Sequence, residues 1–237
     1  MMAGACSART TPEAFQSPPA PAGLLTAWQT LGASLDRDTQ SWRAEGARLL
    51  RSWQRWPRAY HDQRHLAACI GQWQRLQQER PGSMQNPQAV ALALWFHDAI
   101  YWPWRRDNEA RSAAWAQRFL TAQALPAALT HTVVQHIMDT RHAASATCGD
   151  GQWVVDMDLA ILGQDEIVFR RYERHVRQEY FFVRRSRYIA GRRAVLLGFL
   201  DQPRIYQTDW FHQRLEAQAR SNLAQSVHAL EQGQLRI

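Results

Sequence analysis

The residues with the clearest chemical potential are a histidine–aspartate pair, His97-Asp98, inside an apolar segment. The segment covers residues 89–104 (AVALALWFHDAIYWPW), and Asp98 is its only acidic residue. A buried carboxylate is costly unless something pairs with its charge, and no arginine stands within a helical turn of Asp98. We therefore expect the partner to come from elsewhere in the fold, as an arginine, a set of hydrogen-bond donors or a metal ion.

The same anomaly recurs in two other apolar segments. Asp156 and Asp158 interrupt the run 153–162 (WVVDMDLAIL), and on a helix two residues at this spacing point to different sides, so at most one of them faces a shared site. His65 lies on the inner stripe of another expected helix, with His61 one turn before it. Imidazole and carboxylate together favour Mn, Fe, Co, Ni or Zn over Ca.

Several motifs, in order along the chain, resemble the HD superfamily of metal-dependent phosphohydrolases, and most closely a small bacterial family of predicted members. The motifs are Tyr60-His61 with His65, residues 93–101 (ALWFHDAIY), Asp107-Asn108-Glu109 with Arg111-Ser112, Asp156-Met157-Asp158-Leu159 with residues 161–163, Gln178-Glu179-Tyr180 and Pro203-Arg204-Ile205-Tyr206. The resemblance covers roughly residues 24 to 232. It implies an HD-type helical fold that binds one divalent metal ion (Mn, Fe, Co, Ni, Zn or Mg) through His65, His97, Asp98 and Asp158.

The activity that the resemblance implies is hydrolysis of a small phosphorylated metabolite or a nucleotide by a metal-activated water. Asp98 and Glu109 are the expected catalytic residues. Glu109 resembles the acidic residue that some HD nucleotidases place beside the substrate. Its alternative role is a favourable interaction with the dipole of the helix that begins there.

Four further residues are expected to bind the substrate. Arg105 and Arg106 occupy the loop after the His-Asp helix, and a planar guanidinium suits bidentate contact with phosphate; an exposed loop arginine is the alternative. His61 and His142 are expected to face the substrate or to support the metal ligands. Relatives often carry a histidine pair near position 142, whereas this chain has one histidine there, so a second metal ion is in doubt.

Other classes of function remain open. A non-catalytic HD module that binds a nucleotide or a partner protein is one, and an HD-type iron oxygenase, which needs further histidines, is another. Nucleic-acid binding is disfavoured despite the net charge of +7, because the densest arginine run, Arg170 to Arg193, contains interspersed aromatic and apolar residues and is typical of a solvated helix face.

Almost every segment has helical periodicity, and no alternating strand pattern occurs. We expect an all-α, single-domain helical bundle over residues 23–237, after a flexible Pro/Ala/Ser-rich tail at residues 1–22. The expected helices cover residues 24–35, the region 42–53, and residues 61–78, 87–102, 107 onward, 126–140, 153–162, 165–180, 184–200 and 209–232.

The composition also bears on location. No stretch approaches the ~18 apolar residues of a membrane span, and the N-terminal segment lacks the apolar core of a signal peptide. We therefore expect no membrane association and a cytoplasmic location. Three distant cysteines, Cys6, Cys69 and Cys148, fit reduced thiols.

Overall fold

The computed structural model describes residues 23–37, 39–141 and 149–235, and within these ranges the chain is an all-α, single-domain bundle without strands. The α-helices are α1 (Leu24–Ala33), α2 (Gln40–Ser52), α3 (Gln63–Glu79), α4 (Pro87–Phe96), α5 (Asn108–Ala122), α6 (Ala127–Asp139), α7 (Gly149–Leu159), α8 (Glu166–Glu179), α9 (Arg185–Leu200) and α10 (Asp209–Glu231), and the 3-10 helix η2 (Ala160–Gly163) follows α7. None of these helices has both the length and the apolarity needed to span a membrane. The expected tail at residues 1–22 lies outside the described ranges.

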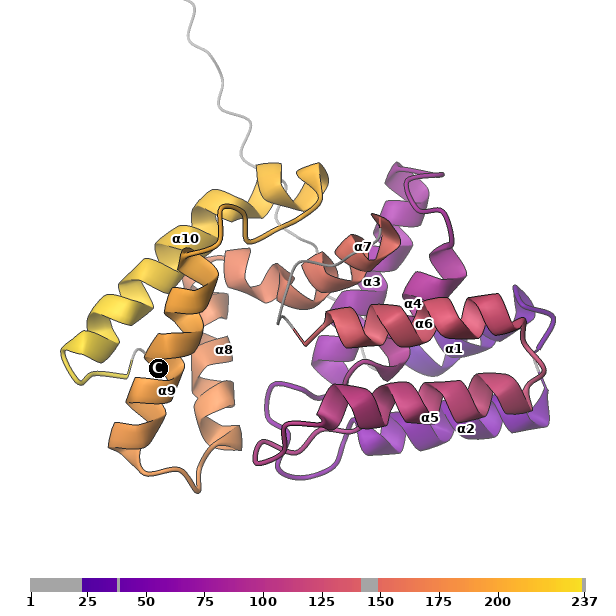
Figure 1. Ribbon diagram of the computed structural model, residues 1–237, viewed down its shortest axis with the longest axis horizontal. Coiled ribbons are helices and arrows are strands. Elements are labelled where there is room, and N and C mark those ends of the chain that lie inside the picture. Colours follow the sequence, from indigo (N-terminus) through magenta and orange to yellow (C-terminus); the bar gives the residue numbers. More distant parts are fainter. Residues whose placement is uncertain (1–22, 38, 142–148, 236–237) are drawn as a thin grey trace, which may run out of the picture.

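Helix α4 forms the centre of the molecule. All residues from Ala89 to Phe96 are buried, and the helix packs against α3, α6 and α7 (Figure 1). A helix that is apolar all round requires such a position. Asn86 caps its start by accepting a hydrogen bond from the Ala89 N–H, and Pro87 occupies the first turn.

The end of α4 differs from the sequence-based expectation. The apolar pattern predicts a helix up to Trp102, but α4 ends before His97. The backbone N–H of Ile100 donates to the Ser112 hydroxyl at 3.0 Å, and the N–H of Trp102 donates to the Asn108 side chain at 3.1 Å. These two side chains of α5 replace the helical partners of the backbone, so residues 98–102 form a loop.

Helices α1 and α2 are locked together by a reciprocal pair of tryptophans. The Trp28 indole N–H donates to the Trp42 carbonyl at 2.7 Å, and the Trp42 indole N–H donates to the Trp28 carbonyl at 3.0 Å. The two rings stack with centroids 4.5 Å apart. Each ring lies directly over a glycine of the other helix, Trp28 over Gly46 and Trp42 over Gly32, and the absence of a side chain there permits the close approach.

Helices α8 to α10 lie on one side of the molecule and α1 to α6 on the other, with α7 between them (Figure 1). Asp156 of α7 is fully buried and accepts hydrogen bonds from the backbone N–H groups of Gln207 and Thr208, at 2.8 and 2.7 Å, where α10 begins. Asn222 of α10 donates to the Leu162 carbonyl of η2 at 2.8 Å. These bonds attach α10 to the centre of the bundle.

Candidate metal centre

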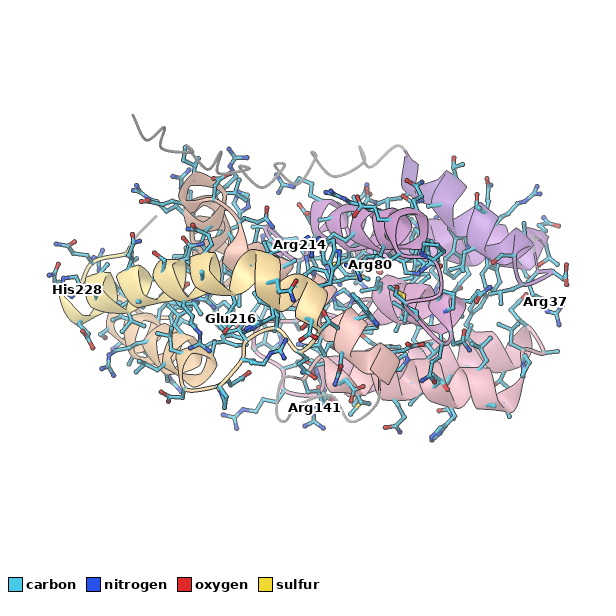
Figure 2. All side chains as sticks on the ribbon, turned by 90° about the horizontal axis from the view of Figure 1, so that it is seen from above. Arg37, Arg80, Arg141, Arg214, Glu216 and His228 are labelled. Atoms are coloured by element: carbon cyan, nitrogen blue, oxygen red, sulfur yellow. The ribbon has the colours of Figure 1, made fainter. Side chains whose placement is uncertain are left out.

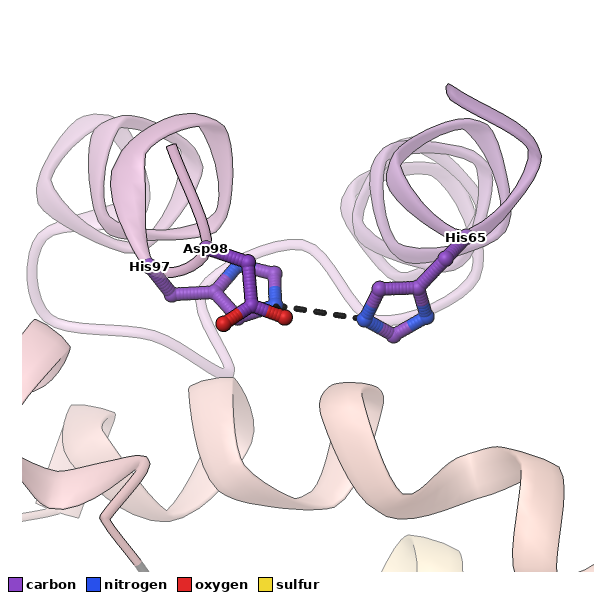
Figure 3. A group of neighbouring side chains, drawn as sticks. All are labelled: His65, His97 and Asp98. Carbon is purple, nitrogen blue, oxygen red and sulfur yellow. Dashed lines mark hydrogen bonds and ion pairs between the residues drawn. The ribbon is translucent and has the colours of Figure 1, made fainter. Parts of the chain in front are cut away.

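The four side chains predicted to bind a metal ion lie together where α3, the end of α4 and α7 meet. His65 Nε2 is 3.2 Å from His97 Nε2 and 3.0 Å from the Asp158 carboxylate. His97 Nε2 is 3.6 Å from Asp98 and 3.5 Å from Asp158. Figure 3 shows His97 and Asp98, side by side at the end of α4, facing His65 of α3. We refer to His65, His97, Asp98 and Asp158 as the four-residue cluster.

The two aspartates of α7 point in different directions, as their spacing predicts. Asp158 contacts His65 and His97, whereas Asp156 binds the start of α10. The helix therefore uses one carboxylate for the cluster and the other to anchor a neighbouring element.

Local structure fixes both imidazoles. His97 Nδ1 lies 2.9 Å from the Leu94 carbonyl. Because a carbonyl can only accept, Nδ1 carries a hydrogen, and Nε2 is the ring nitrogen that faces the cluster. The Trp53 ring packs 5.3 Å from the His97 ring, and the Tyr60 ring packs 4.8 Å from the His65 ring. The ligand atoms are thus oriented by the fold itself.

Burial and charge differ across the cluster. The His65 and His97 side chains are 2% and 1% exposed, whereas those of Asp98 and Asp158 are 12% and 14% exposed, so solvent reaches the cluster from the carboxylate side. Burial alone lowers the pKa of His97, but the Asp98 and Asp158 carboxylates outweigh it and raise this pKa to about 9. The cluster therefore favours a positive charge between its ligand atoms.

The donor set fits a divalent cation. Two imidazole nitrogens and two carboxylates that converge in a mostly buried place need a cation among them, either a proton or a metal ion. Mixed nitrogen and oxygen ligands are typical of zinc and of first-row transition metals. The residues that would hold such an ion are the four of the cluster.

Glu179, the last residue of α8, joins the loops on either side of the cluster. Its Oε1 accepts from the backbone N–H groups of residues 59–61 at 2.8 to 2.9 Å. Its Oε2 pairs with His61 Nδ1 at 2.7 Å and accepts from the Tyr101 hydroxyl at 2.9 Å. Burial alone raises the pKa of Glu179, but His61 and the backbone donors outweigh it and lower this pKa to about 2. Glu179 is thus a fixed negative charge that positions both rings.

His61 stands beside the cluster. Its ring stacks on Tyr101 with centroids 4.1 Å apart and lies edge-on to His65 at 6.0 Å. The His61 side chain is 22% exposed. Since Nδ1 is bound to Glu179, Nε2 is the polar atom that this ring can offer to a ligand.

Arg58 is the arginine that the fold brings to Asp98. Its guanidinium donates to the main-chain carbonyls of His61 at 2.6 Å, Asp98 at 2.8 Å and Ala99 at 3.2 Å. The sequence-based expectation was a partner for the Asp98 carboxylate from elsewhere in the fold, and the contacts of Arg58 do not supply it. The arginine binds the backbone of Asp98 and does not neutralise its carboxylate directly.

The other predicted site residues are not members of the cluster. Arg105 makes a bidentate contact with Asp107, at 2.6 and 2.8 Å, so the structure gives its guanidinium a local partner in place of a phosphate. Arg106 is exposed, and Glu109 is half-buried in the first turn of α5. The prediction for His142 lies outside the described residues.

Four exposed aromatic side chains, which we call the aromatic rim, come from the loops before α3 and α5 and from the turn after α8. Trp56, Trp104, Phe181 and Phe182 are 69%, 53%, 53% and 46% exposed. Their ring centroids are 5.3 Å apart for Trp56 and Phe181 and 5.7 Å apart for Trp104 and Phe182. Contiguous exposed aromatic surface is typical of a ligand or partner site.

Arg58 and Glu179 were not among the predicted site residues, although Glu179 stands in the motif Gln178-Glu179-Tyr180. The sequence does indicate that Glu179 is buried, because its spacing continues the stripe of α8 formed by Phe169, Glu173 and Val176. An acidic residue at such a position must find donors. Arg58 lies in a loop and follows no periodic pattern, so nothing in the sequence identifies the carbonyls that it binds.

Three comparisons with known proteins yield no match: no protein-family model, no curated protein and no solved structure is significantly similar to this chain. The resemblance to HD phosphohydrolases therefore stays a prediction that depends on the motifs themselves.

Proposed function

We propose that this protein is a metal-dependent phosphohydrolase that cleaves a small phosphorylated metabolite or a nucleotide. The observation that carries the proposal is the convergence of His65, His97, Asp98 and Asp158 in one mostly buried cluster. A divalent cation held there would lower the pKa of a bound water toward neutrality and polarise a phosphoryl oxygen.

The surrounding side chains define how a substrate would bind. It would approach from the side of Asp98 and Asp158, the more exposed half of the cluster. Asp98 would accept a hydrogen bond from the attacking water and so orient it. His61, whose ring Glu179 holds next to His65, would hydrogen-bond the phosphoryl group through Nε2. Glu109 is the second acidic candidate for proton transfer.

The aromatic rim and Arg106 support a nucleotide within this substrate class. Aromatic faces stack on planar rings, and two members of the rim, Trp56 and Trp104, come from the loops that carry His61 and Tyr101. Arg106 is an exposed loop arginine after the His-Asp segment and remains the candidate phosphate contact there. We therefore expect nucleoside monophosphates to be cleaved better than aliphatic phosphate esters.

Metal content and phosphate release, measured on wild type and on Asp98→Ala, test this proposal. We expect wild type to carry a divalent metal ion and to release phosphate from nucleotides. Asp98→Ala should lose the metal and at least about 100-fold of the activity, because several kcal/mol of transition-state stabilisation are removed. The matched control is Asp201→Ala, which removes an exposed carboxylate at the end of α9 and should change neither quantity.

Two results would count against the proposal. Metal retained by Asp98→Ala would show that the four-residue cluster is not the binding site. Metal lost by this variant, together with no phosphate release from any substrate by wild type, would contradict hydrolysis and favour a non-catalytic module or an iron oxygenase.

A further inference from the structure

A second feature with ligand-binding chemistry lies away from the cluster, between α2 and α5. It is a cavity of about 680 Å³, within the usual range of ~300–1,000 Å³ for small-molecule sites. Arginines are its main polar lining, three from α2 and the residues after it and two from α5. These five residues, which we call the arginine cavity, are Arg48, Arg51, Arg55, Arg111 and Arg118.

The positive charge of the arginine cavity is only partly compensated. Arg48 pairs with Glu45, and Arg111 pairs with Asp107. Among the described residues, Arg51, Arg55 and Arg118 have no carboxylate partner, and all three are exposed. Like charges gathered around one hollow repel one another, so an anion that bound there would relieve this repulsion.

Contacts with side chains of α2 and α5 hold two of the residues that line the arginine cavity, Trp115 and Ile100. The Trp115 indole N–H donates to the Glu45 carboxylate, and the Arg48 guanidinium lies 4.5 Å above the Trp115 ring. Ile100 also lines the cavity, and its backbone N–H is held by Ser112 of α5. Arg48 is thus held against Trp115, and the other four arginines line the same cavity around these contacts.

Arginines also occur outside this cavity, most densely along the run from Arg170 to Arg193. Figure 2 shows four others, Arg37 near one end of the molecule and Arg80, Arg141 and Arg214 nearer its middle. What distinguishes the α2–α5 face is that its five arginines line one hollow.

We propose that the arginine cavity binds a small molecule that carries two or more phosphate groups. Guanidinium groups make bidentate, charge-assisted hydrogen bonds with phosphate oxygens. Several arginines on opposing walls match several linked phosphates, whereas a single phosphate reaches only some of them. The bounded volume favours a small ligand over an extended polymer. The site shares no lining residue with the four-residue cluster, and the proposal does not depend on hydrolysis at that cluster.

Calorimetric titration with inorganic tripolyphosphate, orthophosphate and a nucleoside triphosphate tests the proposal, in buffer without added divalent metal. We expect wild type to bind tripolyphosphate or the nucleotide at least about 10-fold more tightly than orthophosphate. The double variant Arg51→Ala/Arg118→Ala removes one unpaired arginine from each wall and should weaken this binding at least about 10-fold, the loss typical of charge-assisted hydrogen bonds. Both side chains are exposed, so the variant should keep the wild-type melting temperature.

Two control variants separate a built site from general charge and from the metal centre. Arg171→Ala/Arg174→Ala removes two exposed arginines of α8 and the same total charge, and it should bind like wild type. Asp98→Ala should also bind like wild type, because it alters only the cluster.

Each contrary outcome would overturn the proposal. Equal weakening in both double-arginine variants would indicate a non-specific charge effect. Loss of binding in Asp98→Ala would assign the ligand to the cluster, and absence of binding in wild type would leave the arginine cavity without the proposed ligand class. A single-stranded oligonucleotide that bound more tightly than the small ligands through Arg51 and Arg118 would identify a nucleic-acid surface instead.

Discussion

The buried acidic residues of this chain differ in how many hydrogen-bond donors the fold brings to their carboxylates. Glu179 has three backbone donors, an imidazole and a hydroxyl, and Asp156 accepts from Gln207 and Thr208. The Asp98 carboxylate, by contrast, lies 3.6 Å from His97 Nε2, beyond hydrogen-bond distance. Asp98 thus pairs with an imidazole more loosely than Glu179 does, and a cation at coordination distance would neutralise its charge more directly, which supports its role as a metal ligand.

The substitution Glu179→Gln should lower the free energy of unfolding by about 3 kcal/mol at neutral pH. The pKa of Glu179 is about 2 in the fold, against an ordinary value of 4.5, and each unit is equivalent to ~1.4 kcal/mol. Because the folded-state pKa is depressed, the stabilisation is fully present above about pH 4.5 and is lost as the pH falls toward 2.

Urea unfolding at pH 7 and at pH 3 measures this dependence. The difference between wild type and Glu179→Gln should shrink at pH 3. Glu166→Gln, an exposed position at the start of the same helix, should change stability by no more than about 0.5 kcal/mol at either pH. A gap for Glu179→Gln that is equally large at both pH values would contradict the assigned ionisation.

Of the four-residue cluster, Asp98 could be predicted from the sequence as an acid on an otherwise apolar segment, whereas His65, His97 and Asp158 were predicted from the order of the motifs and the resemblance that they carry. An acid in such a segment carries its own signal, the cost of burying it without a partner. Arg105 shows the limit of this reasoning: its phosphate-binding role was predicted from residue type and loop position, and the pairing with Asp107 became visible only from side-chain geometry. His61 was identified, but its orientation by Glu179, over a hundred residues away in sequence, was not.

At the level of elements, the start of α4 is set by residues next to it in sequence, whereas its end is set by residues of another helix. The predicted start of α4 at residue 87 is confirmed, and Asn86 caps it while Pro87 occupies the first turn. The end of α4 depends on Ser112 and Asn108, which belong to another helix. No local pattern contains such tertiary hydrogen bonds, and for this reason the predicted helix was too long.

The contact between α1 and α2 gives a prediction at this scale. Gly46→Ala should destabilise the protein by about 1–3 kcal/mol, the usual cost of overpacking, because a Cβ there would overlap the Trp28 indole. This loss exceeds the gain of roughly 1 kcal/mol that alanine brings to a helix interior. Thermal unfolding followed by circular dichroism measures the change.

Gly198→Ala in α9 is the matched control for Gly46→Ala. A Cβ at Gly198 meets no atom within 4 Å, so the same substitution should stabilise the protein by about 0.5–1 kcal/mol. If Gly46→Ala raised the melting temperature as Gly198→Ala does, the close packing of α1 on α2 would not hold in solution.

Over the whole molecule, the four-residue cluster lies where distant parts of the chain meet. Its ligands come from α3, the end of α4 and α7, and Glu179 connects the neighbouring loops to α8. Helix α7 in turn binds α10 through Asp156. A cation in the cluster would therefore cross-link segments that separate on unfolding, and the unfolded chain would not preserve the site.

Removal of metal should for this reason lower the melting temperature of the whole protein. A metal ion present at about 100 times its dissociation constant stabilises the folded state by ~2.7 kcal/mol, which corresponds to roughly 5–10 °C for a chain of this size. We expect differential scanning calorimetry to show that loss for wild type after treatment with a chelator. Asp98→Ala should show no chelator-dependent shift, and Glu179→Gln, which melts earlier but keeps all four ligands, should retain it. The two variants separate loss of the ion from a general loss of stability. A chelator-dependent change in the melting temperature of Asp98→Ala equal to that of wild type would place the metal outside the four-residue cluster. So would the absence of any such change in metal-loaded wild type.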